Sequence, residues 1–264
     1  MNEAALRALR GLLLDLDGVL YVEGEPIAGS QAALRALRGS GLGLRFVTNT
    51  TAHSRGETLE KLGRLGFELA PQELVTPARL ARAHCEAAGH RRVALIMNDS
   101  VKEDFEGLEE ADVDVDAVII GDLGEQFGFR ILNRAFRLVM DGAELVALQK
   151  NRFWMTADGL SLDAGPFVAA IEYATSRRAH VVGKPFGGFF AAVLDDLGLE
   201  AGEAAMVGDD IESDIGGALG AGLAAVLVRT GKFREDFVEA SGIEPTATID
   251  SLAALPGLLG VGEG

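Results

Sequence analysis

Short apolar runs alternate with segments of helical periodicity along most of the 264-residue chain, and this alternation constrains the fold more than any other feature. Such alternation is typical of a parallel sheet with helices on both faces, so we predict an α/β fold with a doubly wound parallel sheet. We expect strands at Leu12–Leu16, Leu42–Val47, Val93–Met97, Ala117–Ile120, Glu144–Leu148, His180–Val182, Ala204–Val207 and Ala224–Val228. We expect helices at Gln31–Arg38, Ser54–Leu65, from Thr76 onward, and at Ile131–Met140, Phe167–Ser176, Phe189–Leu197 and Ser213–Ala221.

Local signals mark two helix starts and one hairpin. Ser54 and Glu57 have the spacing of a capping box, and Thr76 followed by Pro77 suits an N-cap with proline in the first turn. The segments Phe153–Thr156 and Leu160–Leu162 flank Ala157-Asp158-Gly159, which is typical of a hairpin turn.

The charge balance excludes two classes of partner. With 24 basic and 40 acidic residues the net charge is −16, a field that repels nucleic acid and anionic lipid. We therefore expect neither a nucleic-acid partner nor a membrane partner. The sequence leaves the oligomeric state, including a homodimer, open.

Cysteine content and hydropathy favour a cytoplasmic protein. Cys85 is the only cysteine, which excludes an internal disulfide, and we expect it to be a small buried helix residue. The longest uncharged run, Ile215–Val228, is shorter than a membrane span requires. Asp15 and Asp17 interrupt the apolar N-terminal stretch, where a signal peptide would carry no acids.

The first candidate for chemistry is the pair Asp15 and Asp17, which ends an apolar strand just before Gly18. Open α/β sheets bind ligands at the carboxyl ends of their strands. Two neighbouring acids repel each other there, which suggests a cation such as Mg²⁺. Taken alone, the motif fits a strand that ends in a polar turn equally well.

Two further strands end in polar residues. Thr48, Asn49 and Thr50 follow the run Leu42–Val47, and hydroxyl, amide and free N–H groups can donate to phosphate oxygens. Lys184 follows the run His180–Val182, where it could supply positive charge to a phosphoryl group. By itself the first pattern is an ordinary strand-to-helix loop, and a lone lysine is usually solvated.

A fourth strand, Ala204–Val207, leads into the acidic cluster Asp209, Asp210 and Asp214. Acids near a helix start interact favourably with the helix dipole, which is the simpler explanation for Asp214. Asp209 and Asp210 lie earlier, at the strand end, where metal ligation is the sharper hypothesis.

Together these four motifs, in this order, resemble the haloacid dehalogenase-like superfamily, and the long insertion between the second and third resembles the cap of its NagD-like branch. The resemblance covers roughly residues 10 to 250. It implies a Rossmann-like catalytic core formed by residues 1–78 and 179–264, with residues 79–178 inserted as an α/β cap. It also implies a Mg²⁺-dependent phosphatase acting on a small phosphorylated substrate.

The resemblance implies a role for each acid of the motifs. Asp15 would attack phosphorus and form an aspartyl-phosphate, and Asp17 would protonate the leaving oxygen and then activate water. The Asp15 carboxylate, the Asp17 main-chain carbonyl and the Asp209 carboxylate would hold Mg²⁺. Asp210 and Asp214 would belong to the first or second shell around the ion.

The remaining motif residues would serve phosphate binding. Thr48, Asn49 and Thr50 would hold the transferring phosphoryl group, and Lys184 would neutralise its charge. Some relatives carry Ser at the position of Asp17. The Asp of this chain follows the general phosphatase pattern, so the substrates of those relatives transfer poorly to it.

Substrate specificity should reside in the insertion, where Lys150, Arg152 and Trp154 form the most basic and aromatic patch. A solvated strand end with a core tryptophan explains the same patch equally well. The four histidines, His53, His84, His90 and His180, show no metal-ligand spacing, and we expect structural or surface roles for them.

Two other classes of protein share some of these features. A receiver-like signalling module also places acids, Thr and Lys at sheet ends, but Asp17 and the long insertion argue against it. A catalytically silent Mg²⁺-binding or phosphate-binding protein would not need every catalytic position filled, as it is here.

Overall fold

The computed structural model describes residues 6–156 and 159–261, and its internal contacts divide the chain into two units. The core unit comprises Met1–Thr48, Leu59–Val75 and Lys184–Gly264. The inserted unit comprises Asn49–Thr58 and Thr76–Gly183. This division differs from the expected cap of residues 79–178 by a few residues at each end, and it adds the short segment Asn49–Thr58.

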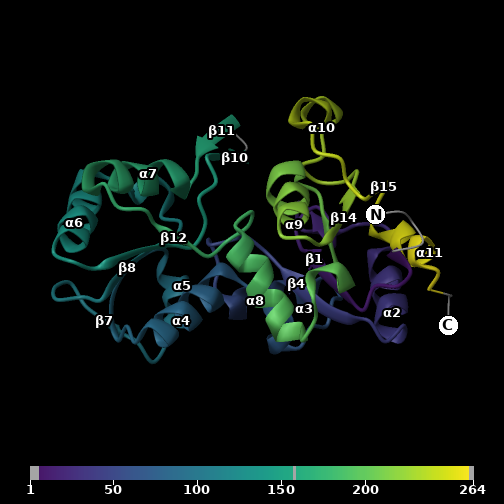
Figure 1. Ribbon diagram of the computed structural model, residues 1–264, viewed down its shortest axis with the longest axis horizontal. Coiled ribbons are helices and arrows are strands. Elements are labelled where there is room, and N and C mark those ends of the chain that lie inside the picture. The colour runs from purple at the N-terminus through teal and green to yellow at the C-terminus, as the bar shows by residue number, and fades with distance from the viewer. Residues whose placement is uncertain (1–5, 157–158, 262–264) are drawn as a thin grey trace. The chain divides into compact units, whose positions relative to one another are not determined.

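A six-stranded parallel sheet forms the centre of the core unit (Figure 1). Its spatial order is β15-β14-β13-β1-β4-β5, so the chain builds outward from β1 first in one direction and then in the other. The strands are β1 (Gly11–Asp15), β4 (Gly43–Val47), β5 (Leu74–Val75), β13 (Ala204–Gly208), β14 (Ala224–Val228) and β15 (Ala247–Ile249). A short antiparallel pair, β2 (Tyr21–Val22) and β3 (Glu25–Pro26), follows β1.

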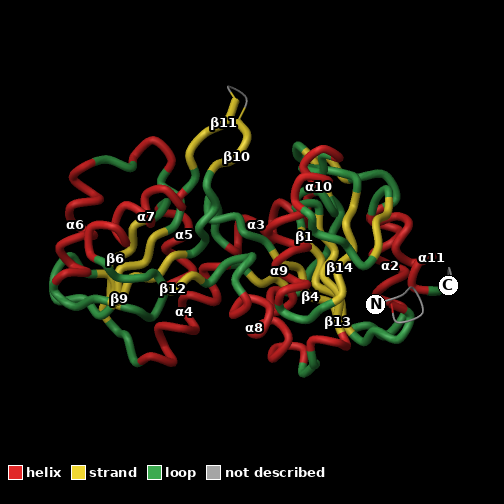
Figure 2. The backbone as a smooth tube through the Cα atoms, turned by 45° about the horizontal axis from the view of Figure 1, so that its top comes forward, coloured by secondary structure: helices red, strands yellow, loops and turns green. Residues whose placement is uncertain are grey.

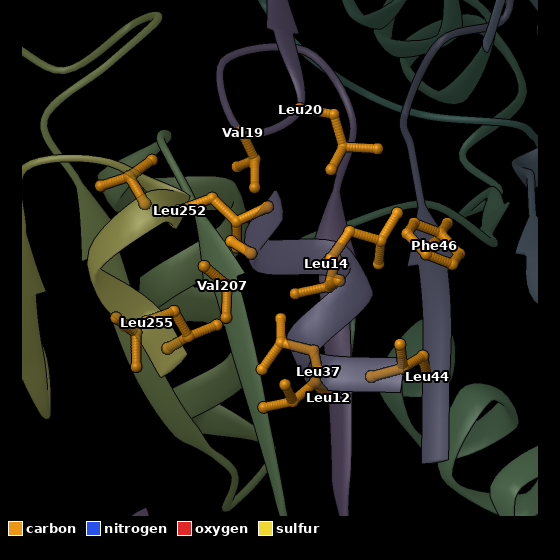
Figure 3. Close-up of a cluster of buried hydrophobic side chains, with 14 of the residues drawn as sticks. Leu12, Leu14, Val19, Leu20, Leu37, Leu44, Phe46, Val207, Leu252 and Leu255 are labelled. Atoms are coloured by element: carbon orange, nitrogen blue, oxygen red, sulfur yellow. The ribbon is translucent and has the colours of Figure 1, made fainter. Parts of the chain in front are cut away.

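Strand β1 is buried on both faces because its residues are almost all aliphatic. Leu12 and Leu14 point into one hydrophobic cluster with Leu37, Phe46 and residues of other elements (Figure 3). Leu13, which alternates with them, is also fully buried, so both faces of the strand are covered.

Helices pack on this sheet at both faces. Leu37 of α2 (Ser30–Gly39) and Leu255 of α11 (Leu255–Leu259) belong to the cluster with Leu12, whereas α8 (Gly187–Leu197) contacts β4 and α9 (Gly217–Gly220) contacts β14. A further helix of this unit is α10 (Glu235–Ser241), and α3 (Arg55–Arg64) has residues in both units.

The inserted unit has its own parallel sheet, of order β12-β9-β8-β6-β7. Its strands are β6 (Arg92–Ile96), β7 (Glu109–Glu110), β8 (Ala117–Ile120), β9 (Glu144–Ala147) and β12 (His180–Val181). Its helices are α4 (Pro77–Ala88), α5 (Asp99–Lys102), α6 (Phe129–Met140) and α7 (Ala164–Thr175). Residues of α4 pack with one set of strand side chains, and residues of α6 and α7 pack with the alternate set.

An antiparallel hairpin of β10 (Phe153–Thr156) and β11 (Gly159–Leu162) projects from the inserted unit (Figure 2). Its two strands confirm the predicted hairpin, while the turn residues Ala157 and Asp158 lie outside the described residues. Short 3₁₀ helices occur at Pro71–Glu73, Glu103–Phe105, Gly124–Gln126, Ala201–Glu203 and Leu252–Ala254.

Both predicted helix starts are confirmed. Ser54 and Glu57 form the reciprocal bonds of a capping box, with the Ser54 N–H donating to the Glu57 carboxylate (2.9 Å) and the Glu57 N–H to Ser54 Oγ (3.2 Å). The Thr76 hydroxyl accepts from the Arg79 N–H at 3.2 Å. Cys85 is fully buried in α4, also as expected.

The predicted helix Ser213–Ala221 is wrong at its start. The chain enters a π-helical turn, Ile211–Gly216, before α9 begins. The physical reason is the cap, because the Asp210 carboxylate accepts from the N–H groups of Glu212 and Ser213 and starts the turn two residues early.

Hydropathy gives no membrane span in the described part of the chain, where every helix is too short or too polar to cross a bilayer.

Burial of Leu12 leads to a stability prediction. Leu12→Ala removes a fully buried side chain and should lower the free energy of unfolding by about 2–5 kcal/mol. Leu160→Ala, in the exposed hairpin where the side chain is 67% accessible, is the matched control and should change stability by less than about 0.5 kcal/mol. Urea unfolding measures both. Equal losses in the two variants would contradict the assigned core.

Candidate active site

Three carboxylates converge in the core unit at the carboxyl edge of the sheet. Asp15 ends β1, Asp209 follows β13 directly, and Asp214 comes from the π-helical turn. One oxygen from each lies within 4.8 Å of the others, and all three residues are buried. Because β1 separates the two directions in which the sheet is built, the cluster lies at the topological switch point, where open α/β sheets bind ligands.

A buried lysine joins two of these acids. The Lys184 ammonium donates to Asp15 Oδ1 at 2.7 Å and to Asp214 Oδ1 at 2.6 Å, and the lysine is only 2% exposed. Burial disfavours its charged form, but the two carboxylates outweigh burial and raise the Lys184 pKa above its ordinary value. Lys184 therefore faces three carboxylates, and the nearby charge of Lys232 lowers the Asp209 pKa without cancelling the excess of negative charge.

The shortage of positive charge appears in the pKa values of the acids. Burial, followed by the charges of Asp15 and Asp214, raises the pKa of Asp209 to about 8. Burial also raises the pKa of Asp214, although the Lys184 charge opposes it. A cation bound among the three acids would relieve this repulsion, so they could hold a metal ion.

Two glycine turns close tightly over Asp209. Gly18 (φ +81°) and Gly231 (φ +62°) both adopt left-handed backbone conformations, and a Cβ at either position would overlap the Asp209 carboxylate. The Lys232 N–H donates to Asp209 Oδ2 at 2.7 Å, and the Thr230 hydroxyl donates to the Gly18 carbonyl. These contacts fix the orientation of one Asp209 oxygen.

Residues Thr230–Lys232 were missed by the sequence reasoning. A signal was present, because this segment follows the predicted strand Ala224–Val228 and must therefore lie at the same edge of the sheet as the four motifs. The signal was weak because the segment contributes a backbone N–H, which every residue except proline has, so the residue types Thr-Gly-Lys do not reveal the contact with Asp209.

The Asp210 side chain accepts hydrogen bonds from backbone N–H groups and is not one of the three clustered carboxylates. Its Oδ1 accepts from the N–H groups of Glu212 (3.1 Å) and Ser213 (2.9 Å), and its own N–H donates to Asp214 Oδ2 at 3.2 Å. Burial would raise its pKa, but the Lys232 charge and these hydrogen bonds lower it overall. Asp210 thus orients the turn that carries Asp214.

Asp17 lies just beyond the cluster and exposes its side chain. Desolvation by the neighbouring protein atoms still raises the Asp17 pKa, against the opposing charges of Lys61 and Lys232. A raised pKa suits a carboxyl group that must hold a proton before it donates one.

The predicted phosphate-binding residues are divided between the units. Thr48 is buried in the core unit directly after β4, where Val47 lies opposite Asp15 in the sheet register. Asn49 and Thr50 belong by their contacts to the inserted unit. A Cβ at Gly183 would come within 2.9 Å of the Asn49 amide oxygen, so Asn49 lies against the residue that precedes Lys184.

The basic patch of the insertion is held by internal contacts. Lys150 Nζ pairs with Glu172 Oε2 at 2.6 Å, and Glu172 also accepts from the Ala179 N–H at 3.0 Å. Arg152 is exposed, with its guanidinium 5.5 Å from the centre of the Phe153 ring. Trp154 pairs through its backbone with Ser161, and its side chain lies outside what the structure describes.

Comparison with known proteins identifies the class to which this fold and site belong. A family model described as haloacid dehalogenase-like hydrolase matches residues 12–110, and a related HAD-hydrolase-like model matches residues 181–255. The chain belongs to the haloacid dehalogenase-like hydrolase family and is an enzyme of that family, so the predicted family and fold are confirmed.

Individual relatives match nearly the whole chain. The human haloacid dehalogenase-like hydrolase domain-containing protein 2 is 43% identical over 248 residues, covering 94% of this chain and 95% of that protein. Human phospholysine phosphohistidine inorganic pyrophosphate phosphatase is 40% identical over 260 residues, covering 96% of this chain and 95% of that protein.

Solved structures agree with these sequence matches. A 4-nitrophenylphosphatase from Thermotoga maritima superposes with a TM-score of 0.89 at 25% identity, covering 97% of this chain and 99% of that chain. NagD from E. coli shares the fold with a TM-score of 0.83 at 22% identity, covering 93% of this chain and 98% of its own.

The raised Asp209 pKa leads to a pH-dependent stability prediction. Without metal, folded Asp209 keeps its proton up to about pH 8, whereas the unfolded chain loses it near the ordinary value of about 3.9. The stability contributed by this group is therefore greatest below about pH 4 and is lost as the pH rises towards 8.

Asp209→Asn cannot ionise and should be more stable than the parent at pH 9 in chelator, by at least about 1 kcal/mol, the equivalent of one pKa unit. At pH 5 the two proteins should differ much less. Thermal unfolding at both pH values measures the difference. If Asp209→Asn were no more stable than the parent at pH 9, ionisation of buried Asp209 would not destabilise the fold, and the prediction would be wrong.

Proposed function

We propose that this enzyme is a Mg²⁺-dependent phosphatase that hydrolyses a small phosphorylated metabolite through an aspartyl-phosphate on Asp15. The observation that carries the proposal is the buried arrangement of Lys184 between Asp15 and Asp214, beside Asp209, at the switch point of the sheet. Phosphoryl transfer requires positioning and charge neutralisation more than elaborate covalent chemistry. The cluster would supply the positioning, and Lys184 together with a bound Mg²⁺ would supply the neutralising charge. The phosphatase names of the relatives support the same activity.

The donor set of the cluster fits Mg²⁺. All the available ligands are oxygen atoms, which this hard cation prefers, and the acids outnumber the buried lysine. The Asp15 and Asp209 carboxylates and the Asp17 main-chain carbonyl would hold the ion. Asp214 belongs to the same group of oxygens, whereas Asp210 supports it through the turn. When bound, Mg²⁺ would neutralise charge on the phosphoryl oxygens.

Asp15 is the proposed nucleophile. Lys184 donates a hydrogen bond to one of its oxygens at 2.7 Å, which orients the carboxylate. The other oxygen would form a bond to phosphorus as the bond between phosphorus and the leaving oxygen breaks. Thr48, Asn49 and Thr50 would bind the phosphoryl oxygens, and Lys184 would offset their charge.

Asp17 is the proposed general acid and base. Its raised pKa keeps a proton available, which passes to the leaving oxygen in the first step. In the second step the ionised Asp17 takes a proton from water, whose oxygen attacks phosphorus. The bond between phosphorus and Asp15 then breaks, and inorganic phosphate is released with the carboxylate restored.

The proposed substrate class rests on the net charge and on the chemistry of the core motifs. The net charge of −16 disfavours polyanionic macromolecules, and the described core residues recognise only a phosphoryl group. Sugar phosphates, nucleotides, pyrophosphate and phosphoamino acids all fit this requirement. A screen of these compounds with Mg²⁺ identifies the physiological substrate.

The two aspartates have separable roles that mutation can test. Asp15→Asn should abolish turnover of 4-nitrophenyl phosphate and leave no phosphoenzyme, because an amide oxygen is a poor nucleophile. Asp17→Asn should lower turnover by about 10²–10⁴-fold. It should also accumulate phosphoenzyme, because this leaving group needs little protonation while water still needs a base. Steady-state rates and acid-quenched phosphoenzyme are the measurements.

Asp236→Asn is the matched control, since this exposed acid lies in α10 and should retain full activity. Excess chelator should remove the activity of the parent enzyme, and added Mg²⁺ should restore it. Turnover in Asp15→Asn, or full activity in chelator, would contradict the proposal.

We further propose that the inserted unit confers substrate specificity, because the core motifs cannot distinguish one leaving group from another. Lys150 is unsuitable for the test, since its loss would break the pair with Glu172. The double variant Arg152→Ala/Trp154→Ala should lower kcat/KM by about 10–100-fold for the substrate found in the screen. Hydrolysis of 4-nitrophenyl phosphate should stay nearly unchanged. Equal loss on both substrates would place the patch in the chemical step, and no loss on either would leave it a solvated strand end.

A further inference from the structure

Three of the four histidines gather around one glutamate in the inserted unit. His84 Nε2 lies 3.0 Å from Glu144 Oε1, and His90 Nε2 lies 2.7 Å from Glu144 Oε2. The His180 ring stacks on the His84 ring with centroids 3.8 Å apart and planes inclined by 13°. One donor atom from each of His84, Glu144 and His180 lies within 4.8 Å of the others.

The cluster uses none of the residues of the phosphatase motifs, although His180 begins the strand that leads to Lys184. His84 comes from α4, Glu144 begins β9, and His180 begins β12, which pairs with β9 in parallel. The group therefore lies at the amino ends of these strands, whereas the polar motif residues follow the carboxyl ends of theirs. The sequence predicted only structural or surface histidines, because residues from three distant segments show no ligand spacing.

We infer that His84, Glu144 and His180 form a binding site for one divalent transition-metal ion, of which Zn²⁺ fits best, with His90 beside it as a further nitrogen donor. Two imidazoles and a carboxylate, with water in the fourth position, are a common donor set for Zn²⁺. Nitrogen ligands of this kind disfavour Mg²⁺ and Ca²⁺, which prefer all-oxygen sites.

The surroundings of the cluster suit ion binding. Side-chain exposure is 25% for His84, 20% for His90 and 34% for Glu144, and His180 is exposed, so an ion can enter from solvent. The backbone positions are set by buried neighbours, with Cys85 next to His84 and Val146 opposite His180 in the sheet. Imidazole lone pairs lie in the ring plane, so the stacked His84 and His180 rings must turn towards the ion, and the Glu144 hydrogen bonds must be replaced by metal bonds of about 2.0–2.2 Å.

A bound ion would link three segments of the inserted unit. It would connect the later part of α4 to the starts of β9 and β12, in addition to the parallel pairing of β9 with β12 and the Glu144 contacts of His84 and His90. Binding to the folded state alone stabilises that state, so the ion should raise the melting temperature.

The test is titration of the full-length protein with Zn²⁺ by calorimetry, in buffer with excess Mg²⁺. We expect one equivalent bound at this site and a rise in Tm. The double variant H84A/H180A should lose that equivalent, with affinity lowered at least tenfold. His53→Ala, which removes an exposed histidine 3.7 Å from Glu57, is the matched control and should bind as the parent does.

Two further measurements keep the outcome decisive. Asp209→Asn, which alters the carboxylate cluster of the core unit, should retain the Zn²⁺ equivalent if the histidine cluster holds it. Co²⁺ should give a visible ligand-field spectrum in the parent that disappears in H84Q/H180Q, a variant of similar size that guards against misfolding of the alanine form. Unchanged Zn²⁺ affinity and an unchanged Co²⁺ spectrum in the histidine variants would overturn the proposal.

Discussion

The buried Lys184 ammonium is the interaction on which the site depends. It joins the end of β1 to the turn after β13 through two charged hydrogen bonds, and it is nearly inaccessible to solvent. Removing one partner of such a buried pair costs about 3–5 kcal/mol, because an uncompensated charge remains. Asp15 and Asp214 must therefore stay in place whether or not a ligand is bound, and the cluster is preorganised for a phosphoryl group.

Preorganisation explains two irregular features around the acids. The π-helical turn begins at Ile211. It lets Asp210 cap the turn while Asp214, four residues after Asp210, accepts a hydrogen bond from Lys184. The left-handed glycines Gly18 and Gly231 allow two backbone segments to approach Asp209 more closely than any side chain would permit. The π-helical turn thus positions the Asp214 carboxylate, and the left-handed glycines allow the Lys232 N–H to reach Asp209.

Features of the fold and site that depend on neighbouring residues could be predicted from the sequence, whereas features that depend on contacts between distant residues could not. Runs such as Gly11–Asp15 and the capping box at Ser54 are local patterns, so strands, helix starts and the acids at strand ends could be predicted from them. The pair between Lys150 and Glu172, the Lys232 N–H bonded to Asp209 and the histidines around Glu144 join residues far apart in the chain. No periodicity or spacing encodes such contacts, which depend on how the sheets are assembled.

The two proposed cation sites differ in the chemistry of their donors, and this difference decides which ion each can select. The cluster around Asp15 and Asp209 offers only oxygen atoms, so a hard ion such as Mg²⁺ is its natural occupant. The cluster around Glu144 offers imidazole nitrogens from His84 and His180, which hold a transition metal far better than Mg²⁺ does. Millimolar Mg²⁺ would thus occupy the first site and leave the second for a scarcer ion. The two proposed sites would thus keep the catalytic and structural metals of one chain apart by donor type and by the availability of each ion.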